Sequence, residues 1–204
     1  YPLTYSIMAD LITVQEYKDA EGIRGDNNDD RLAILVPQVS ELAKKYCGTS
    51  FIDFFSSNKT ETFNISDNNT SVVVVSETPI NSVVSVKERD NPSTDYITLT
   101  NNTEFYIDTN SDSIFRLDSD GDRKAFKRGF GSVEVVYKAG YATTPKDLQL
   151  ALFDLVTYYL KDEHKQRRTL GGASIQNQGT AGIRTSTDFP DHIKRVLDLY
   201  RVII

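Results

Sequence analysis

The spacing of apolar residues changes twice along the chain, and this change constrains the fold more than any other sequence feature. Residues 32–46 place apolar side chains every three or four positions, which is the period of one helical face. Residues 51–141 instead form short β-branched and aromatic runs, separated by Asn, Asp, Ser and Gly. A helical period returns at residue 144. The pattern predicts an α+β fold with helices from both chain ends and strands from the middle.

Three segments follow from this order of elements. Residues 1–50 are expected to supply the first helices of a small helical bundle, and residues 142–204 its last helices with a long loop at 165–187. Residues 51–141 are expected to form a large antiparallel β-rich insertion, because closely spaced strands with short turns make hairpins of a small sandwich or open barrel. A turn is expected at residues 78–81. The predicted strands are residues 60–65, 71–76, 83–89, 96–100, 104–108, 113–117 and 132–137.

Several residues predict where the helices begin and end. Thr13 and Glu16 have the spacing of a capping box, which opens a short first helix. Asp29 or Asp30 is expected to cap the second helix, and Pro37 inside that helix is expected to kink or split it. Further boundary residues are Gly22 and Gly48 as helix ends, with Pro145 at a first helical position and Asp188 and Pro190 before the last helix.

Composition narrows the classes of function. Charged residues make up 25% and hydrophobic residues 39% of the 204 residues, which is ordinary for a globular protein. The net charge of −6 opposes tight, nonspecific wrapping of nucleic acid. No run of apolar residues is long enough to cross a bilayer, and Tyr1 to Met8 lacks a signal-peptide pattern. Either residues before Tyr1 have been removed, or Met8 is an internal start.

The residues that carry chemistry in enzymes do not form a recognisable constellation here. Cys47 stands alone at the end of an apolar helix, where it is interpreted as a small core residue. His164 and His192 fall in different helices without predicted ligand partners. The run Asp118-Ser-Asp-Gly-Asp122 lacks the spacing of an EF-hand and predicts an acidic hairpin turn. We therefore predict no catalytic, cofactor-binding or metal-binding residues, and no enzymatic activity.

The helix that begins near Pro145 is apolar around most of its circumference. Besides a core-facing stripe, it carries four further large side chains: Leu150, Phe153, Tyr158 and Leu160. A helix that is apolar nearly all round is buried on more than one side. In a chain of this size, the pattern predicts that these four residues contact a neighbouring subunit.

Two segments, in their order along the chain, resemble the head–tail connector proteins of tailed phages, also called head-completion adaptors. The first runs from Leu11-Ile-Thr-Val-Gln-Glu-Tyr-Lys to Tyr46-Cys-Gly-Thr-Ser-Phe51. The second runs from Val133-Glu-Val-Val-Tyr-Lys-Ala-Gly-Tyr141 through Pro145-Lys-Asp-Leu148 to Tyr200-Arg201, with Pro79-Ile-Asn-Ser-Val83 between the two segments. The resemblance implies a homo-oligomeric ring, usually of twelve copies, in the neck of a virion that is assembled in the host cytoplasm. It implies docking on the portal protein, attachment of a tail or neck protein, passage of double-stranded DNA without sequence recognition, and no membrane partner.

The long loop and the chain terminus are the predicted contacts with the portal or the channel. Loops of this length are usually functional or disordered, and an apolar terminus is costly to leave in water. The basic cluster of Lys161, Lys165, Arg167 and Arg168 is interpreted either as a solvated helix end or as a contact with an acidic subunit, the portal or DNA. The predicted contact residues are Arg167, Arg168, Gly171, Gly172, Arg184, Val202, Ile203 and Ile204.

Two other functions stay open at the level of the sequence. The chain could be another neck or tail component, similar to a tail terminator. It could also be a carbohydrate-binding module of a receptor-recognition protein, built on the β-rich segment. Such modules usually stack aromatic rings on sugars, but Trp is absent here. The aromatic candidates, which could equally be core residues, are Phe105, Tyr106, Phe115, Phe126 and Phe130.

Overall fold

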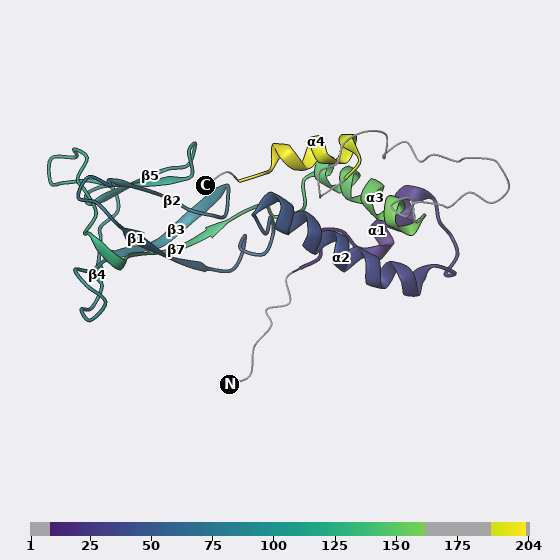
Figure 1. Cartoon of the computed structure of the whole chain (residues 1–204), viewed down its shortest axis with the longest axis horizontal. Coiled ribbons are helices and arrows are strands. Elements are labelled where there is room, and N and C mark those ends of the chain that lie inside the picture. The colour runs from purple at the N-terminus through teal and green to yellow at the C-terminus, as the bar shows by residue number, and fades with distance from the viewer. Residues whose placement is uncertain (1–8, 162–188, 203–204) are drawn as a thin grey trace, which may run out of the picture. The chain divides into compact units, whose positions relative to one another are not determined.

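The chain folds into two compact units, which Figure 1 shows in a computed structural model. The structure describes residues 9–161 and 189–202. The helical unit draws on both chain ends, up to Gly48 and from Thr144 onward, and the β unit comprises residues 49–143. Helices and antiparallel sheets are both present, so the predicted α+β class is confirmed.

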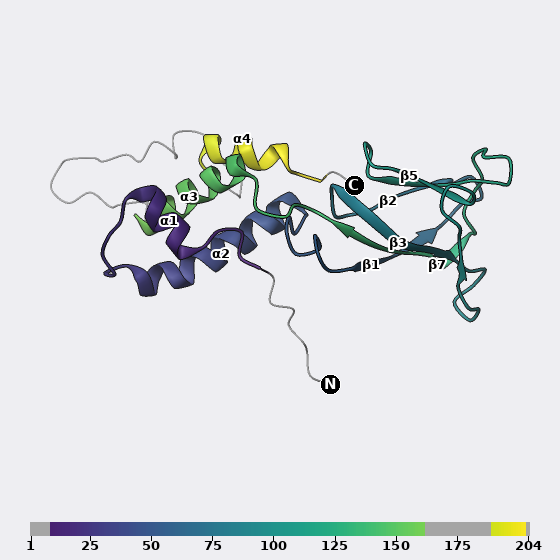
Figure 2. The ribbon, with the colours of Figure 1, turned by 180° about the vertical axis from the view of Figure 1, so that it is seen from behind.

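The helical unit contains four described helices, whose bounds are α1 Val14–Glu21, α2 Asp29–Cys47, α3 Lys146–Leu160 and α4 Asp191–Leu199. Helix α2 packs against α1, α3 and α4, and α3 also packs against α4 (Figure 2). Each helix contributes one apolar stripe to a shared interior, as the three- and four-residue spacing predicts. The largest fully buried side chains of this interior are Ile12, Tyr17, Leu32, Val36, Leu148, Leu152, Leu155, Ile193 and Leu197.

The helix boundaries confirm the predicted capping box and the helix ends at Gly22 and Gly48, and they correct the predicted positions of Asp29, Asp30 and Pro145. The Thr13 hydroxyl accepts a hydrogen bond from the Glu16 amide at 3.1 Å, and the Glu16 carboxylate accepts one from the Thr13 amide at 2.7 Å, which completes the capping box. The N-cap of α2 is Asn28 rather than Asp29 or Asp30, and the two carboxylates instead lie in the first turn, where they stabilise the positive end of the helix dipole. Pro145 and Pro190 stand one position before their helices, as N-caps.

Pro37 lies inside one continuous helix, so the expectation that it could split α2 is wrong. A proline has no amide hydrogen, and it therefore deprives the carbonyl four residues earlier of its helical donor. That carbonyl belongs to Ala33, whose side chain is exposed. Water can take the place of the missing donor on this side of the helix, and the apolar stripe on the other side holds the two halves together.

The β unit is a sandwich of two antiparallel sheets. The first sheet has the strand order β1–β7–β3–β4, and the second has the order β2–β6–β5. All the predicted strands are present, and every strand pair is antiparallel. The bounds are β1 Lys59–Ile65, β2 Val72–Val74, β3 Ile80–Glu88, β4 Ile97–Thr98, β5 Phe105–Asp108, β6 Ser113–Arg116 and β7 Gly129–Ala139.

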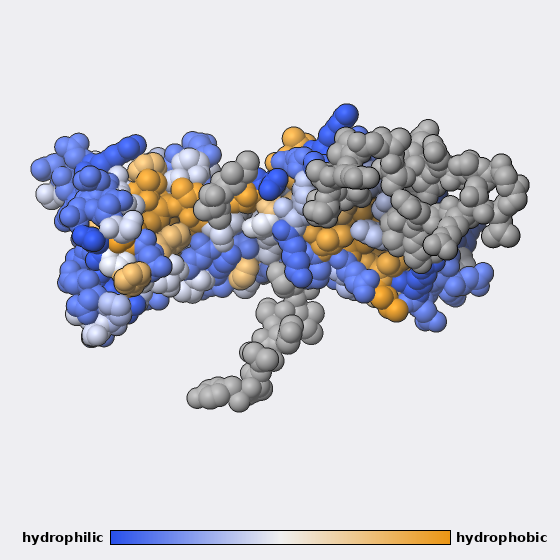
Figure 3. All heavy atoms as spheres, viewed as in Figure 1, coloured by the Kyte–Doolittle hydropathy of each residue, from blue (hydrophilic) through white to orange (hydrophobic). Residues whose placement is uncertain are grey.

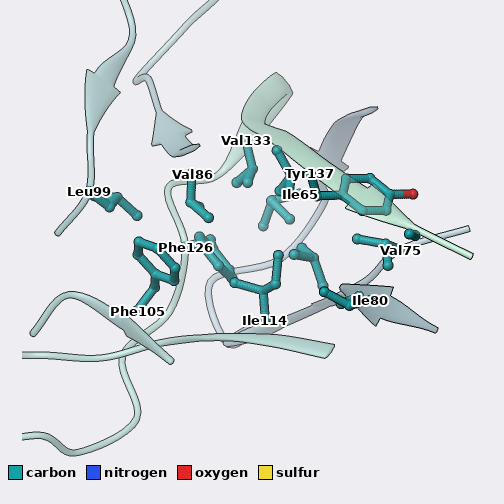
Figure 4. Packing of buried hydrophobic residues seen from close by; sticks show 13 residues of the cluster. Ile65, Val75, Ile80, Val86, Leu99, Phe105, Ile114, Phe126, Val133 and Tyr137 are labelled. Atoms are coloured by element: carbon teal, nitrogen blue, oxygen red, sulfur yellow. The ribbon is translucent and has the colours of Figure 1, made fainter. Parts of the chain in front are cut away.

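Side chains from both sheets meet in one apolar core. Figure 4 shows Phe105, Phe126 and Ile114 facing Val86 and Val133 from the opposite side. Full burial of one such side chain stabilises the folded state by roughly 1.5–3 kcal/mol. These inward positions alternate with outward ones along the strands, as the two-residue period predicts.

Strand β3 begins earlier than the sequence predicts. Residues 78–81 were expected to form a turn, but Ile80 already pairs with Ala139 of β7 and is buried. The Ile80 amide donates to the Asp112 carboxylate at 2.7 Å, which fixes the start of the strand. Turn-forming residues beside Ile80 suggested a break because the partner that orders them is distant in the sequence.

The two points where the chain enters and leaves the β unit are hydrogen-bonded to each other. The Tyr141 amide donates to the Phe51 carbonyl at 2.7 Å, and Phe51 has a positive φ of 64°. Gly140, at φ 96°, lies against the same carbonyl, since a Cβ atom there would be 2.1 Å from the Phe51 oxygen. Only glycine fits this close approach.

A buried carboxylate holds the first residues of the β unit in place. Glu77 accepts hydrogen bonds from the Thr49 hydroxyl at 2.8 Å and from the Ser50 amide at 2.8 Å. Its other oxygen lies 3.1 Å from the Lys59 ammonium, and its own amide donates to the Tyr137 hydroxyl at 3.1 Å. Burial raises the pKa of the Tyr137 phenol well above its usual value. The carboxylate is thus satisfied in every direction, which is the condition for burying it without a large cost.

Candidate assembly surfaces

Each unit leaves several large apolar side chains exposed among polar ones, and Figure 3 shows such apolar areas on both units. Contacts between proteins commonly combine an apolar centre with a polar rim. Among the described residues, the exposed large hydrophobics of the helical unit are Ile34, Leu150 and Leu199. Those of the β unit are Phe55, Val74, Val84, Ile97, Tyr106 and Phe130.

The four predicted interface residues of α3 differ in exposure. Leu150 keeps 63% of its surface exposed, whereas Phe153, Tyr158 and Leu160 are half-buried. The Phe153 ring packs at a centroid distance of 6.2 Å from the ring of Tyr17, so part of its surface already serves the helical unit itself. Leu150 is therefore the most exposed of the four residues.

Polar groups with defined partners surround Leu150 on its helix. Asp147, three positions earlier, accepts a hydrogen bond from the Tyr200 hydroxyl at 2.6 Å. Asp154, four positions later, lies 3.7 Å from Nε2 of His192. Positions three and four residues apart share one helical face, so Leu150 sits between two carboxylates that are held by α4 and its end. The arrangement has an apolar centre and a polar rim.

The predicted contacts of the C-terminus are only partly within the described residues. The Val202 amide donates to the Cys47 carbonyl at 2.8 Å, and the Val202 side chain is half-buried. The Cys47 thiol donates to the Leu197 carbonyl at 3.4 Å, and burial raises its pKa to about 12. Cys47 is thus a core residue, as predicted. Ile203 and Ile204 lie outside the described residues.

The predicted loop contacts also lie outside the described residues, which stop at 161 and resume at 189. They are Arg167, Arg168, Gly171, Gly172 and Arg184, together with Lys165 of the basic cluster. Lys161, which follows α3 and opens that cluster, is exposed.

The aromatic candidates for sugar stacking divide into core and surface residues. Phe105 and Phe126 are buried in the core, and Phe115 is half-buried beneath the guanidinium of Arg123 at 4.8 Å. Tyr106 and Phe130 remain exposed. Two of the five rings are therefore unable to contact a sugar.

The acidic run at residues 118–122 forms a turn, as predicted. One oxygen of the Asp118 carboxylate accepts from the amides of Asp120 and Asp122 at 3.0 and 2.9 Å, and the Asp118 amide donates back to the Asp122 carbonyl. The carboxylate is thus engaged by its own backbone. Within residues 9–161 and 189–202, no three His, Cys, Asp or Glu side chains gather in a way that could hold a metal ion. In the same residues, no helix is long and apolar enough to span a membrane.

A buried ion pair joins the two sheets and has no signal in the sequence. Arg116 of β6 contacts the carboxylate of Glu88 in β3 at 2.9 and 3.3 Å, and both side chains are nearly inaccessible to solvent. The remaining guanidinium nitrogen donates to the carbonyls of Glu104 and Leu117 at 2.7 Å each. Strand periodicity predicts which face a residue occupies, but it does not predict which buried charge meets which.

Comparison with known proteins identifies the class to which this fold belongs. The model of the family described as "Head completion protein" matches residues 10–203. The head completion protein of Escherichia phage T5 is 32% identical over 72 residues, which cover 35% of this chain and 39% of that protein. The match therefore spans well under two thirds of the length of that relative.

Solved structures with a similar fold come from the necks of gene transfer agent (GTA) particles. A chain in the neck of an empty GTA particle, computed with C6 symmetry, has a TM-score of 0.58 at 14% identity, over 95% of this chain and 91% of that one. A chain in the neck of a native particle, computed with C12 symmetry, has a TM-score of 0.53 at 14% identity, over 96% and 95%. At such identities the likeness concerns the fold.

These findings define a class, the head completion proteins, and the fold of this chain is similar to that of chains in the necks of GTA particles. This chain belongs to the head completion protein family, whose model matches nearly all of it. The resemblance to head–tail connector proteins is therefore confirmed.

Proposed function

We propose that this protein is a structural, non-enzymatic subunit of a closed ring in the virion neck, where it docks on the portal, extends the DNA channel and attaches the tail or a further neck protein. The family match over residues 10–203 carries this proposal. The C6 and C12 symmetries with which the similar necks were computed support a ring, and a dodecamer is the proposed stoichiometry.

In this proposal, the helices of both chain ends form the small bundle that builds the ring. A closed ring needs two different surfaces that meet head to tail. The exposed Leu150 on α3, between Asp147 and Asp154, supplies one of these surfaces. The half-buried Phe153, Tyr158 and Leu160 widen it along the same helix.

The portal and channel contacts proposed here are the loop and the chain terminus, with Arg167, Arg168, Gly171, Gly172, Arg184 and Val202–Ile204 as the contacting residues. The hydrogen bond from the Val202 amide to the Cys47 carbonyl supports this role for Val202, because it holds that residue against the helical unit. Assembly in the host cytoplasm belongs to the same proposal.

The charge of the chain supports passage of DNA rather than its retention. Residues 49–143 carry 14 Asp and Glu against 9 Lys and Arg, and the whole chain has a net charge of −6. Excess negative charge repels the phosphate backbone, so the net charge of the subunit opposes tight retention of DNA in the channel.

Cryo-electron microscopy of the intact neck tests the proposal directly. The expected result is a closed ring between portal and tail, with Leu150 buried between adjacent copies. Density for this chain on a fibre or a baseplate would refute the connector role, and a position one layer beyond the portal would favour a component similar to a tail terminator.

Two variants separate the ring contact from the loop contact. Leu150→Asp should give folded chains that enter particles poorly, and Ile34→Asp on α2, with 60% exposure, is the matched control. Removal of residues 171–182 should leave a folded chain that no longer joins heads to tails. Normal assembly by the deletion variant would show that the loop is dispensable.

A further inference from the structure

Strand β7 carries a wide bulge opposite β1. Phe63 pairs with Val133 and Ile65 pairs with Gly129, so Asn64 alone lies opposite three residues of β7. The two extra residues displace the chain locally from the plane of the sheet. Bulges can re-aim a side chain, and they are common next to functional sites. Phe130 is the side chain that this bulge re-aims.

The backbone of the bulge is fixed from three sides at Gly131. Its amide donates to the Asn64 side-chain oxygen at 2.7 Å. Its carbonyl accepts from Nε of Arg89 at 2.9 Å and from the Tyr96 hydroxyl at 2.8 Å. The Arg89 guanidinium also stacks 4.4 Å from the Tyr96 ring centroid, and a Cβ on Gly131, which has φ 56°, would lie 2.9 Å from Nη2 of Arg89. The bulge is therefore rigid before any partner arrives.

Phe130 lies on this bulge with 78% of its surface exposed to solvent. No other large hydrophobic side chain in the described residues is more exposed. The core of the β unit closes without Phe130. An aromatic side chain on a preorganised backbone loses little conformational freedom on binding, and such residues often dominate binding energy. The Phe130 ring is thus placed to bind a pocket on another protein, because it packs into no pocket of the β unit.

Positive charge is concentrated in the segment that leads to Phe130. Residues 123–130 contain Arg123, Lys124, Lys127 and Arg128 and no acidic residue, although the chain as a whole has a net charge of −6. Asp90 compensates Lys127 at 3.0 Å and Asp67 interacts electrostatically with Arg128, whereas Arg123 and Lys124 are exposed. A partner surface that receives Phe130 is therefore most favourable when acidic groups surround its apolar pocket.

We infer that Phe130 is an anchor that inserts into an apolar pocket rimmed by Asp and Glu carboxylates on a different protein of the virion neck. This inference rests on the proposed function, because it takes the partner to be a component of the same particle. It adds a contact from the β unit to the ring contact of α3.

Site-specific photocrosslinking in assembled particles tests the inference. A benzoylphenylalanine at position 130 of the full-length chain keeps an aromatic ring on the bulge, and the same residue at Val84 of β3, which is 56% exposed, is the matched control. Mass spectrometry of the products should find position 130 joined to apolar residues that neighbour Asp or Glu in another virion protein. Position 84 should give at least about tenfold less of that product.

The other outcomes have separate meanings. Crosslinks from position 130 to a second copy of this chain, or equal yields at the two positions, would overturn the anchor. If probes at 130 stay uncrosslinked while a probe at Leu150 crosslinks to a neighbouring copy, the anchor fails and the connector role stands. If the chain is missing from particles, the proposed function itself fails.

A binding measurement then tests the magnitude with the crosslinked virion protein as the purified probe. Phe130→Ala should weaken binding by about 30-fold or more, since an anchor residue at an interface centre costs at least that much when truncated. Val84→Ala should change it less than about threefold, and circular dichroism should show both variants folded. An unchanged affinity for Phe130→Ala would refute the anchor.

Discussion

The ion pair between Arg116 and Glu88 gives the sharpest prediction about stability. Arg116→Met removes the guanidinium but leaves the Glu88 carboxylate buried, with only 6% of its side chain exposed. Loss of one partner from a buried pair destabilises by about 3–5 kcal/mol, because the remaining charge is neither solvated nor neutralised. The carbonyls of Glu104 and Leu117 lose their donor in the same substitution.

Urea unfolding of the full chain measures this loss. With a slope of about 2 kcal/mol per molar urea, the midpoint should fall by about 2 M. In the folded variant, hydrogen exchange at the amides of β3 and β6 should be faster than in the native chain. Such a result would locate the loss of stability in the β unit. Because apolar replacement of a whole buried pair is often nearly neutral, Arg116→Met with Glu88→Met should recover much of the lost stability.

The matched control is the partly exposed pair between Lys87 and Glu134, whose atoms are 2.8 Å apart with side chains 32% and 21% exposed. Lys87→Met should cost no more than about 1 kcal/mol, since solvent screens such pairs. Burial of the pair would not explain the stability of the sandwich if Arg116→Met lowered the free energy of unfolding as little as Lys87→Met does. The same conclusion would follow if the double variant of Arg116 and Glu88 lost as much stability as the two single variants together.

Three further predictions concern single positions. Gly140→Ala should lower the thermal midpoint at least twice as far as Gly121→Ala; both glycines have positive φ, but only Gly140 lies against a carbonyl. Thr13→Ala should cost about 1 kcal/mol in urea unfolding through loss of the cap, whereas Gln15→Ala in the same helix should cost less. The native Cys47 thiol, whose pKa is raised to about 12, should resist a thiol reagent at pH 8 until urea unfolds the chain. Because the unfolded thiol releases its proton near pH 9 and the folded one does not, stability should fall by about 1.4 kcal/mol per pH unit between pH 9 and 12, and Cys47→Ser should remove this part of the slope.

The sequence predicts those parts of the structure that depend on neighbouring residues. The capping box of Thr13 and the strand periods are local signals, and the structure contains the corresponding elements. Strand order is different, because β1 pairs with β7 about seventy residues later and β2 joins the second sheet. No local period encodes such a choice of partner, so the architecture was predicted only to the level of a small sandwich or open barrel.

Local sequence patterns also predicted the candidate surfaces only in part. Helical spacing identified Leu150 as a residue outside the core stripe, and the structure exposes it. The sequence did not distinguish Phe130 from Phe126, which are four residues apart, although one is exposed and the other is in the core. The difference arises from a bulge that Asn64, Arg89 and Tyr96 stabilise from other strands and loops. A flanking glycine pair, Gly129 and Gly131, was the available signal for that bulge.

The hydrogen bond between Tyr141 and Phe51 has a consequence for how such a protein can evolve. It holds together the two crossings through which the chain enters and leaves the β unit. A segment whose ends lie together can be lengthened, shortened or exchanged without pulling apart the elements that flank it. We therefore expect that residues 49–143 can be lengthened, shortened or exchanged while the helices stay folded.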